Sequence, residues 1–520
     1  MHLAPIDWLI ILVYLTGCMG AGIWMRRYVR GVEDFAVAGR AMDLNLGIAS
    51  LAATELGLVT VMYTAQLGFT KGFAGAIIGV LMALAMYLVG RTGFVIGPLR
   101  RAGVMTIPEL FEKRFGIRVR WLAGLFVVFG GLLNMGIFLR LGGEFIVAAT
   151  GIPTHWLEWV MTALLGLVLV YTALGGMLSV LVTDYLQFLV KGMGIVVTSI
   201  LVIASIGWSG LLHGLTNAWS SSQAGNALPG LKMAGHPFNP VYSGWGYVLW
   251  QVIFQIAVVT TWQTQISRVL SARDETIARR MYRRTAFYFV GRFGLPGLWG
   301  AAALVYWTQH GGLPPELQGL PADTASLRAT PAYLGILLPT GFIGLLLAAA
   351  LAAEMSTDSG YLLTWATVIY NDLITPCIKR PLSGATRLLI TRCLVMGIGV
   401  FLLFFGLWYQ LRGNAWDYLA VTGNIYLASV FTLLVAGLYW PRATAQGAYA
   451  ALVLGAIGPI TFLVVNSHKP AGAPDPISPQ ASGAASFALA FLGMIVGSLA
   501  SKRVEGRGSR EAEMSVQSRS

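Results

Sequence analysis

The sequence predicts an all-α, polytopic membrane protein with about thirteen transmembrane helices. Of its 520 residues, 56% are hydrophobic and only 11% are charged, and the mean hydropathy is +0.70. A soluble globular protein carries about 25% charged residues. One globule of this size could not bury so much apolar surface, so lipid must replace water around most of the chain.

Thirteen stretches approach the roughly 20 apolar residues that a helix needs to cross a bilayer. The first has no basic segment before it and no clear cleavage site, so we expect it to be retained as a span. We expect one transmembrane domain over residues 1–501 and a disordered cytoplasmic tail over residues 502–520. The expected spans are 6–25, 44–68, 74–98, 121–149, 156–175, 178–206, 243–266, 285–308, 332–369, 386–409, 418–439, 447–466 and 483–500.

The basic residues predict the orientation of the chain. The net charge of +13 would suit nucleic-acid binding, but the basic residues lie mainly in short loops between apolar spans. One set of alternate loops, with the tail, holds 25 of the 35 Lys and Arg, whereas the other set holds five. The richer set is expected in the cytoplasm. The N-terminus is then outside and the C-terminus inside, in a multi-pass protein of the cell inner (plasma) membrane.

Other protein classes find little support in the sequence. The six histidines lie in loops or at span ends, and no HExxH motif occurs. The three cysteines are too few for a disulfide framework and lack metal-ligand spacing. The glycine-rich run Gly291–Gly297 has no strand before it, so it is not a dinucleotide loop. We therefore expect no catalytic site and no enzyme.

Two polar clusters, Ala53–Gly57 and Met355–Ser359, interrupt apolar spans in the two halves of the chain. Polar groups inside a span are unfavourable and mark an ion or substrate path, and one such interruption in each half is typical of a secondary transporter. Gly57 permits an unwound turn, although close helix packing would also explain it. Free carbonyls of such a turn, together with hydroxyls, suit Na⁺.

Five basic residues lie within the spans: Arg91, Arg140, Lys191, Arg292 and Arg392. Arg140 lies four residues before Glu144, so it either pairs with that carboxylate or clamps a substrate carboxylate. Lys191 lies seven residues after Asp184, and we expect an ion pair or a side chain that reaches the membrane surface. We expect the remaining three to extend to the surface as well.

Several motifs together resemble the sodium:solute symporter family, which includes bacterial proline and sodium/sugar symporters. Tyr171–Ser179, followed by Thr183–Gln187, fits the family signature closely. The other matching segments are Glu33–Phe35 with Ala38–Arg40, Thr106–Glu109 with Lys113–Gly116, Arg268–Asp274, Ala352–Ala353 with Met355–Thr357, and Gly437–Arg442 with Gly447–Ala448. They occur in the family's order over about residues 33–448, so the resemblance covers most of the chain.

The resemblance implies the inverted-repeat fold shared with the leucine-transporter group. One leading helix (6–25) would precede two five-helix repeats, about 44–206 and 243–439, and two extra helices would follow. It also implies Na⁺-coupled symport of a small organic solute into the cell by alternating access, with Na⁺ as the coupling ion.

The resemblance further implies a sodium site between the first and eighth core helices. Its ligands, carried over by position, are the carbonyls of Ala53, Leu56 and Ala353 and the hydroxyls of Ser356 and Thr357. Some relatives hold a second sodium, for which Asp184, Ser356 and Ser359 match the pattern. Asp184 and Ser359 are therefore candidates for a second sodium site or for the exit path. Gly360 stands where those relatives place another hydroxyl, so the chain departs from the pattern there.

Two more departures concern Glu354, which lies where many relatives are apolar and could couple protons, and the segment Trp250–Ala257, which contains no Gly or Pro. An unwound partner helix is therefore not visible in this segment of the sixth core helix.

The predicted substrate lies beside the sodium and contacts Glu55, Leu58, Arg140, Gln251, Phe254 and Gln255. Glu55 and Arg140 favour a charged or zwitterionic solute such as an amino acid or organic acid, whereas stacking on Trp or Tyr would suit a sugar. Two alternatives remain. One is a proton-coupled transporter that uses Glu55, Glu354 or Asp184. The other is a transporter-like sensor that acts with a separate partner, since the roughly twenty-residue tail leaves no room for a kinase of its own. The expected partners are a small solute and the lipid bilayer, and no nucleic acid.

Overall fold

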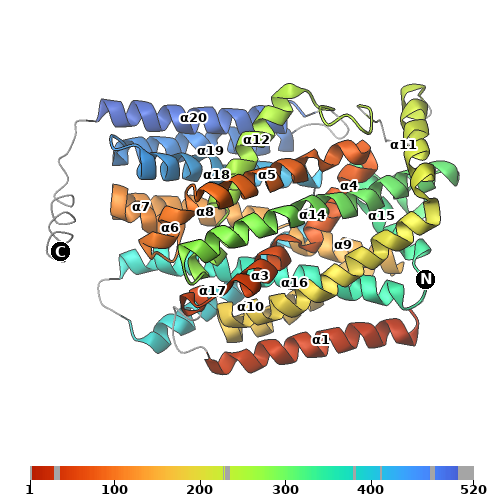
Figure 1. The fold of residues 1–520 in the computed structure, drawn as a ribbon, viewed down its shortest axis with the longest axis horizontal. Helices are drawn as coiled ribbons and strands as arrows, with labels where there is room; N and C mark the ends of the chain where they lie inside the picture. Colours follow the sequence, from red (N-terminus) through yellow and green to blue (C-terminus); the bar gives the residue numbers. More distant parts are fainter. Residues whose placement is uncertain are drawn as a thin grey trace.

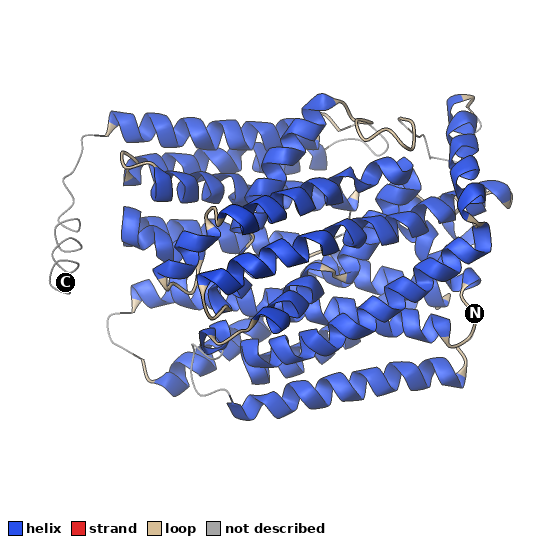
Figure 2. Ribbon diagram, viewed as in Figure 1, coloured by secondary structure: helices blue, strands red, loops and turns tan. Residues whose placement is uncertain are grey.

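The computed structural model describes residues 3–28, 36–225, 228, 233, 235–378, 382–409, 411, 413–468 and 475–501. Within these residues the chain is helical and forms no strand, apart from an isolated parallel bridge between Met42 and Ala272 (Figure 2). Most of the helices run side by side along the long axis of the molecule, whereas α11 stands across this axis at one end (Figure 1). The predicted all-α membrane class is confirmed. The predicted tail and the motif Glu33–Phe35 lie outside the described residues.

The helices follow one another along the chain without any intervening domain in the described part. Short 3₁₀ or π segments lie at Arg26–Tyr28, Ala38–Arg40, Gly72–Ala76, Thr154–Trp156, Pro315–Leu317, Ile369–Ile374 and Thr375–Cys377. The α-helices are α1 (Pro5–Met25), α3 (Leu44–Glu55), α4 (Leu58–Lys71), α5 (Ile77–Thr92), α6 (Ile96–Ala102), α7 (Ile107–Phe115), α8 (Ile117–Met135), α9 (Phe138–Thr150), α10 (Leu157–Ile206), α11 (Trp208–Gln223), α12 (Trp245–Thr261), α13 (Gln263–Ser271), α14 (Glu275–Gln309), α15 (Ala322–Leu337), α16 (Phe342–Val368), α17 (Gly384–Trp408), α18 (Ala415–Tyr439), α19 (Ala445–Ser467) and α20 (Pro479–Ala500).

Nine helical segments in the described part of the chain are long and apolar enough to cross a membrane, so the predicted count of thirteen is not confirmed. The two counts differ partly because two predicted spans can form one segment. The segment Thr154–Ile206 contains the predicted spans 156–175 and 178–206, and α10 changes direction within it at Gly176, whose φ is 53° and ψ −150°. Conversely, the predicted span 332–369 is divided between α15 and α16.

The first core helix is broken, as predicted. The helix α3 ends at Glu55 and α4 begins at Leu58, with Gly57 extended between them at φ −79° and ψ 167°. Any residue could adopt this backbone conformation, but a Cβ at Gly57 would lie 2.5 Å from Oγ1 of Thr357 on α16. Both predicted explanations of Gly57 therefore apply: the chain is unwound at this residue, and two helices approach closely there.

The sixth core helix is continuous over Trp250–Ala257, where the sequence shows no break, but it is broken just beyond that segment. The helices α12 and α13 are separated by Trp262, at φ −63° and ψ 107°. This conformation is allowed for every residue type, so the break needs neither Gly nor Pro and leaves no signal in the sequence.

Side-chain caps fix the starts of two helices that carry site residues. Asp43 Oδ1 accepts a hydrogen bond from the Leu46 amide at 2.8 Å at the start of α3. Asp274 Oδ1 accepts one from the Ile277 amide at 2.8 Å at the start of α14. Both caps satisfy amides that have no partner within the helix.

The helix α10 packs along α16 and α3, and α14 packs along α4 and α3, so these elements surround the first break. The first residue of α1 and the last residue of α20 lie at opposite ends of the bundle, and the basic helices α6 and α7 lie at the same end as the end of α20 (Figure 1). The predicted topology requires this arrangement. Which end faces the cytoplasm stays a prediction.

Candidate functional site

The predicted sodium ligands converge on a basic side chain. The ammonium of Lys191, on α10, donates hydrogen bonds to the Leu56 carbonyl at 3.2 Å, to Ser356 Oγ at 2.8 Å and, at shorter range, to the Ala53 carbonyl. Lys191 is only 1% exposed. Both predicted alternatives for Lys191 are wrong: it does not reach the surface, and in the described part of the chain no salt bridge joins it to Asp184.

The two remaining predicted ligands lie close by on α16. The Thr357 hydroxyl donates to the Thr54 carbonyl at 2.9 Å, and the Ser356 hydroxyl donates to the Ala53 carbonyl at 2.8 Å. Ala353 is buried one turn before them. The structure therefore brings the predicted oxygens of Ala53, Leu56, Ser356 and Thr357 to the junction of α3 and α16. As they stand, these residues do not fit a sodium ion, because the Lys191 ammonium lies where the oxygens converge.

At the second predicted sodium site, the carboxylate of Asp184 is likewise bound by other side chains of the protein. Asp184 Oδ2 accepts hydrogen bonds from Ser50 Oγ at 2.6 Å and Thr54 Oγ1 at 3.2 Å, and it lies 3.5 Å from the Arg268 guanidinium. The side chains of Asp184 and Arg268 are both fully buried. Ser359 lies within α16, where its hydroxyl donates to the Ser356 carbonyl at 3.2 Å.

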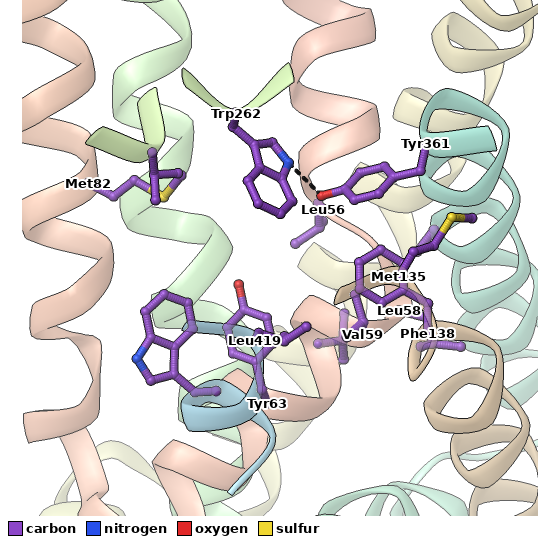
Figure 3. Packing of buried hydrophobic residues seen from close by; sticks show 14 of the residues in the cluster. Leu56, Leu58, Val59, Tyr63, Met82, Met135, Phe138, Trp262, Tyr361 and Leu419 are labelled. Atoms are coloured by element: carbon purple, nitrogen blue, oxygen red, sulfur yellow. Dashed lines mark hydrogen bonds between the residues drawn. The ribbon is translucent and has the colours of Figure 1, made fainter. Parts of the chain in front are cut away.

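A cavity lined by residues of both broken helices lies between the two helix breaks. In Figure 3, Tyr63, Met82, Trp262 and Tyr361 surround a common space, and Trp262 Nε1 donates to the Tyr361 hydroxyl at 2.8 Å. All four line the cavity. Its other aromatic and polar lining residues are Phe138, Phe254, Trp416, Thr54, Glu55, Thr60, Asn134, Gln255, Arg292 and Thr357.

An ion pair forms part of the cavity wall. Arg292, on α14, lies 3.1 Å from Glu55 Oε2 and donates to the hydroxyls of Thr60 at 3.1 Å and Tyr63 at 3.3 Å. Arg292 is 9% exposed, so the expectation that it extends to the membrane surface is wrong. The pair neutralises Glu55 at the end of α3.

Three of the six predicted substrate residues, Glu55, Phe254 and Gln255, line the cavity. Gln251 lies behind Gln255, whose Nε2 donates to the Gln251 Oε1 at 2.9 Å. Leu58 is buried at the start of α4, and the next residue, Val59, contributes to the cavity wall.

Arg140, the sixth predicted substrate residue, does not join the cavity. Its Nε lies 3.4 Å from Glu144 Oε1, four residues later on α9, and its guanidinium also donates to the Gly406 carbonyl at 3.4 Å. Glu144 pairs with Arg328 as well. The structure therefore places Arg140 in the helix-surface ion pair and not in a substrate clamp.

Glu354, the predicted proton-coupling residue, is 1% exposed and packs against Gly142 of α9, where a Cβ would lie 2.5 Å from its Oε1. In the described part of the chain this oxygen has no hydrogen-bond partner, and neither does Oδ1 of Asp358, one turn further along α16. The role of Glu354 in proton coupling stays a prediction.

Sequence reasoning missed Arg292, Trp262 and Tyr361 in the cavity and Lys191 and Arg268 at the cation positions. A signal was available for Arg292 and Lys191, because an ionisable residue inside a membrane span usually marks a functional region. Trp262 and Tyr361 carried no such signal, since aromatic residues are common throughout membrane spans.

Two kinds of comparison identify relatives of the chain. A model of the sodium:solute symporter family matches residues 35–455. A sodium/glucose cotransporter of Vibrio parahaemolyticus is 25% identical over 91% of this chain and 87% of its own length. A sodium/mannose cotransporter of Bos taurus is 27% identical over 97% of this chain and 88% of its own length.

Solved structures share the fold. A Na⁺-coupled sialic acid symporter in a substrate-bound, outward-open state has a TM-score of 0.76 and 19% identity, covering 96% of this chain and 98% of its own. A nucleobase-cation-symport-1 family transporter in a closed conformation has a TM-score of 0.54 and 15% identity, covering 92% and 98%. Because the family model spans most of the chain, this protein belongs to the sodium:solute symporter family, whose coupling ion is sodium.

Proposed function

We propose that this protein is a secondary active transporter that carries a small, neutral, polar organic solute across the membrane by alternating access, with sodium as the coupling ion. Its membership of a transporter family, with relatives named as sodium/solute cotransporters, supports transport and not enzymatic catalysis. The observation that carries the solute proposal is the cavity between the two helix breaks. In this proposal the repeats 44–206 and 243–439 move around the cavity.

The polar groups of the cavity favour a solute with hydroxyl groups. Among the lining residues, the Gln255 Oε1 and the Arg292 Nε have no hydrogen-bond partner within the described part of the chain. The first of these atoms offers an acceptor and the second a donor. Buried polar groups are normally hydrogen-bonded, so a polar solute would satisfy them. Aromatic walls with a few placed polar groups are typical of small-molecule sites.

The charges of the cavity favour a neutral solute. Glu55 is paired with Arg292, and Arg140 pairs with Glu144 outside the cavity. The two charges that suggested an amino acid or organic acid are therefore both neutralised within the protein. The relatives named for glucose, mannose and myo-inositol also point to a sugar or cyclic polyol. Uptake into the cell through an inner membrane, with the N-terminus outside, completes the proposal.

Uptake by proteoliposomes tests this function. The purified full-length protein is reconstituted, and uptake of labelled glucose, mannose and myo-inositol is compared with that of proline and succinate, with an inward gradient of NaCl or of choline chloride. We expect saturable uptake of at least one hydroxylated solute and little uptake of the charged ones. Transport of only proline or succinate would contradict the neutral-solute proposal, and transport of none of them would contradict the function proposed for the cavity.

A substitution in the cavity links uptake to the site. Gln255→Leu keeps a similar volume but removes both polar atoms of the side-chain amide, so we expect the KM for the solute to rise about tenfold, the loss of about 1.4 kcal/mol of binding. Gln446→Leu, at an exposed position on α19, is the matched control. If both variants transport like the wild type, the solute does not bind at Gln255.

A further inference from the structure

The sodium position implied by the family resemblance is held by the chain's own lysine. A lysine ammonium has three N–H donors, and those of Lys191 reach Ala53, Leu56 and Ser356. These are three of the five implied sodium ligands. Two of them are carbonyls at the end of α3 and the third is a hydroxyl of α16. The ammonium therefore links the first and eighth core helices. The family resemblance implies this linking role for sodium.

An independent observation at the second cation position points the same way. Arg268 donates to Thr54 Oγ1 at 2.6 Å and lies 3.5 Å from Asp184, so a guanidinium neutralises the carboxylate that matched the second sodium site. A Cβ at Gly360 would lie 2.8 Å from the Arg268 guanidinium. The missing side chain at residue 360, where this sequence departs from its relatives, therefore gives the guanidinium its space.

We propose that Lys191 is a tethered competitor of sodium at the junction of α3 and α16, so that sodium binds these oxygens only after the ammonium has left them. A sodium ion at these oxygens would lie in contact with a second positive charge, and the same lone pairs cannot serve both cations. In this conformation the ammonium bonds to these oxygens and not to Asp184, whose Oδ2 is engaged by Ser50, Thr54 and Arg268 and whose Oδ1 has no hydrogen-bond partner in the described part of the chain. The inference rests on the proposed function only for the location of the ion site.

Removal of the ammonium tests the proposal directly. Binding of Na⁺ to the detergent-purified, full-length protein is measured by thermal stabilisation in NaCl against choline chloride at equal ionic strength and pH, and by binding of ²²Na⁺. We expect Lys191→Met, which keeps a long unbranched side chain but removes the ammonium, to bind Na⁺ at least tenfold more tightly than the wild type. Adding Ser356→Ala to Lys191→Met should abolish the gain. Equal or weaker Na⁺ binding by Lys191→Met would overturn the proposal.

A second measurement does not depend on whether Lys191→Met folds. Ser356→Ala alone removes an acceptor of the ammonium, so we expect the same decrease of the melting temperature in choline chloride as in NaCl. Thr367→Ala is a matched control, because within the described part of the chain the Thr367 hydroxyl bonds only to the Leu363 carbonyl of its own helix. A decrease confined to NaCl would show that sodium, and not Lys191, occupies the site, and would overturn the proposal.

These measurements contain no solute, so they stand apart from the test of transport. If no solute is transported while Lys191→Met gains Na⁺ binding, the proposed function fails and the competitor role is supported. If the wild type transports a solute without regard to the sodium gradient while Lys191→Met gains Na⁺ binding, sodium coupling of this chain is refuted and the competitor role is again supported.

Discussion

The two broken helices of the core satisfy their backbone in opposite ways. At the break between α3 and α4, the carbonyls of Ala53 and Leu56 accept hydrogen bonds from the Lys191 ammonium. At the break between α12 and α13, the Val259 carbonyl accepts from the Tyr282 hydroxyl at 3.0 Å, and the Ala257 carbonyl accepts from the Thr261 hydroxyl at 2.6 Å. One break is thus a cation site, and the other is held by neutral groups.

The difference teaches that unwinding alone does not make an ion site. Unwinding frees carbonyls at both positions, but in the described part of the chain the acidic and basic side chains Glu55, Asp184, Lys191, Arg268 and Arg292 gather at the first break, and of these only Arg268, on α13, also donates to a carbonyl beside the second break, that of Thr264 at 3.1 Å. The second break carries an aromatic side chain, Trp262, that hydrogen-bonds to Tyr361 and stacks on Tyr426 with ring centroids 5.8 Å apart. The first break is suited to ions and the second to the apolar surface of a solute.

The largest effect should come from the charges at the first break. Arg292→Met leaves the buried Glu55 carboxylate without its partner, and we expect the protein to lose about 3–5 kcal/mol of stability, since breaking a buried pair exposes an uncompensated charge. Unfolding in denaturant monitored by tryptophan fluorescence gives the value. The double variant with Glu55→Gln should recover most of the loss. A double variant as unstable as Arg292→Met would mean that Arg292 stabilises through packing and not through the pair.

A smaller effect should follow from adding one methyl group at the same break. Gly57→Ala brings a Cβ to within 2.5 Å of the Thr357 hydroxyl, and we expect a loss of about 1–3 kcal/mol, because overpacking forces the two helices apart. Gly246→Ala, where a Cβ meets nothing within 4 Å, is the control and should be neutral or slightly stabilising. Equal melting temperatures for Gly57→Ala and the wild type would refute the close approach of α3–α4 to α16.

The smallest effect should come from the neutral break. Trp262→Phe and Tyr361→Phe each remove one partner of the 2.8 Å hydrogen bond and keep an aromatic ring, so we expect each to lose about 1 kcal/mol. A double-mutant cycle should show a coupling of similar size. Because both residues line the cavity, the same variants should change solute affinity without changing Na⁺ affinity. A change in Na⁺ affinity instead would erase the distinction between the two breaks.

The polar positions of this fold could be predicted more completely than its geometry. The membrane class and the broken first core helix followed from composition and from polar residues within apolar spans, whereas the five sodium ligands were implied only by the family resemblance and stay a prediction. The break at Trp262 could not be predicted, since its backbone conformation is open to every residue type. Span counting also fails where two spans form one segment, as they do on either side of Gly176.

The partners of the buried charged side chains were harder to predict from the sequence. Arg140 and Glu144 are four residues apart on one helix, so one of the two predicted alternatives matched the structure. Arg292 and Glu55 are 237 residues apart in the sequence. The packing of α14 against α3 brings them together. Lys191 lies seven residues after Asp184 on the same helix, yet it reaches past that carboxylate to the carbonyls of α3. Sequence spacing therefore predicts pairs within a helix and misses those between helices.

The attachment of the Lys191 ammonium to α10 has a consequence for how the protein responds to its surroundings. A free ion leaves and returns at a rate and with an occupancy that depend on its concentration outside. A cation carried on the chain has instead a constant effective concentration at its ligands, which is set by the length and stiffness of its tether, on the order of millimolar or higher. The junction of α3 and α16 therefore keeps its cation in dilute and in salty media alike, and the four-carbon side chain sets how far the two helices can separate before that cation is lost.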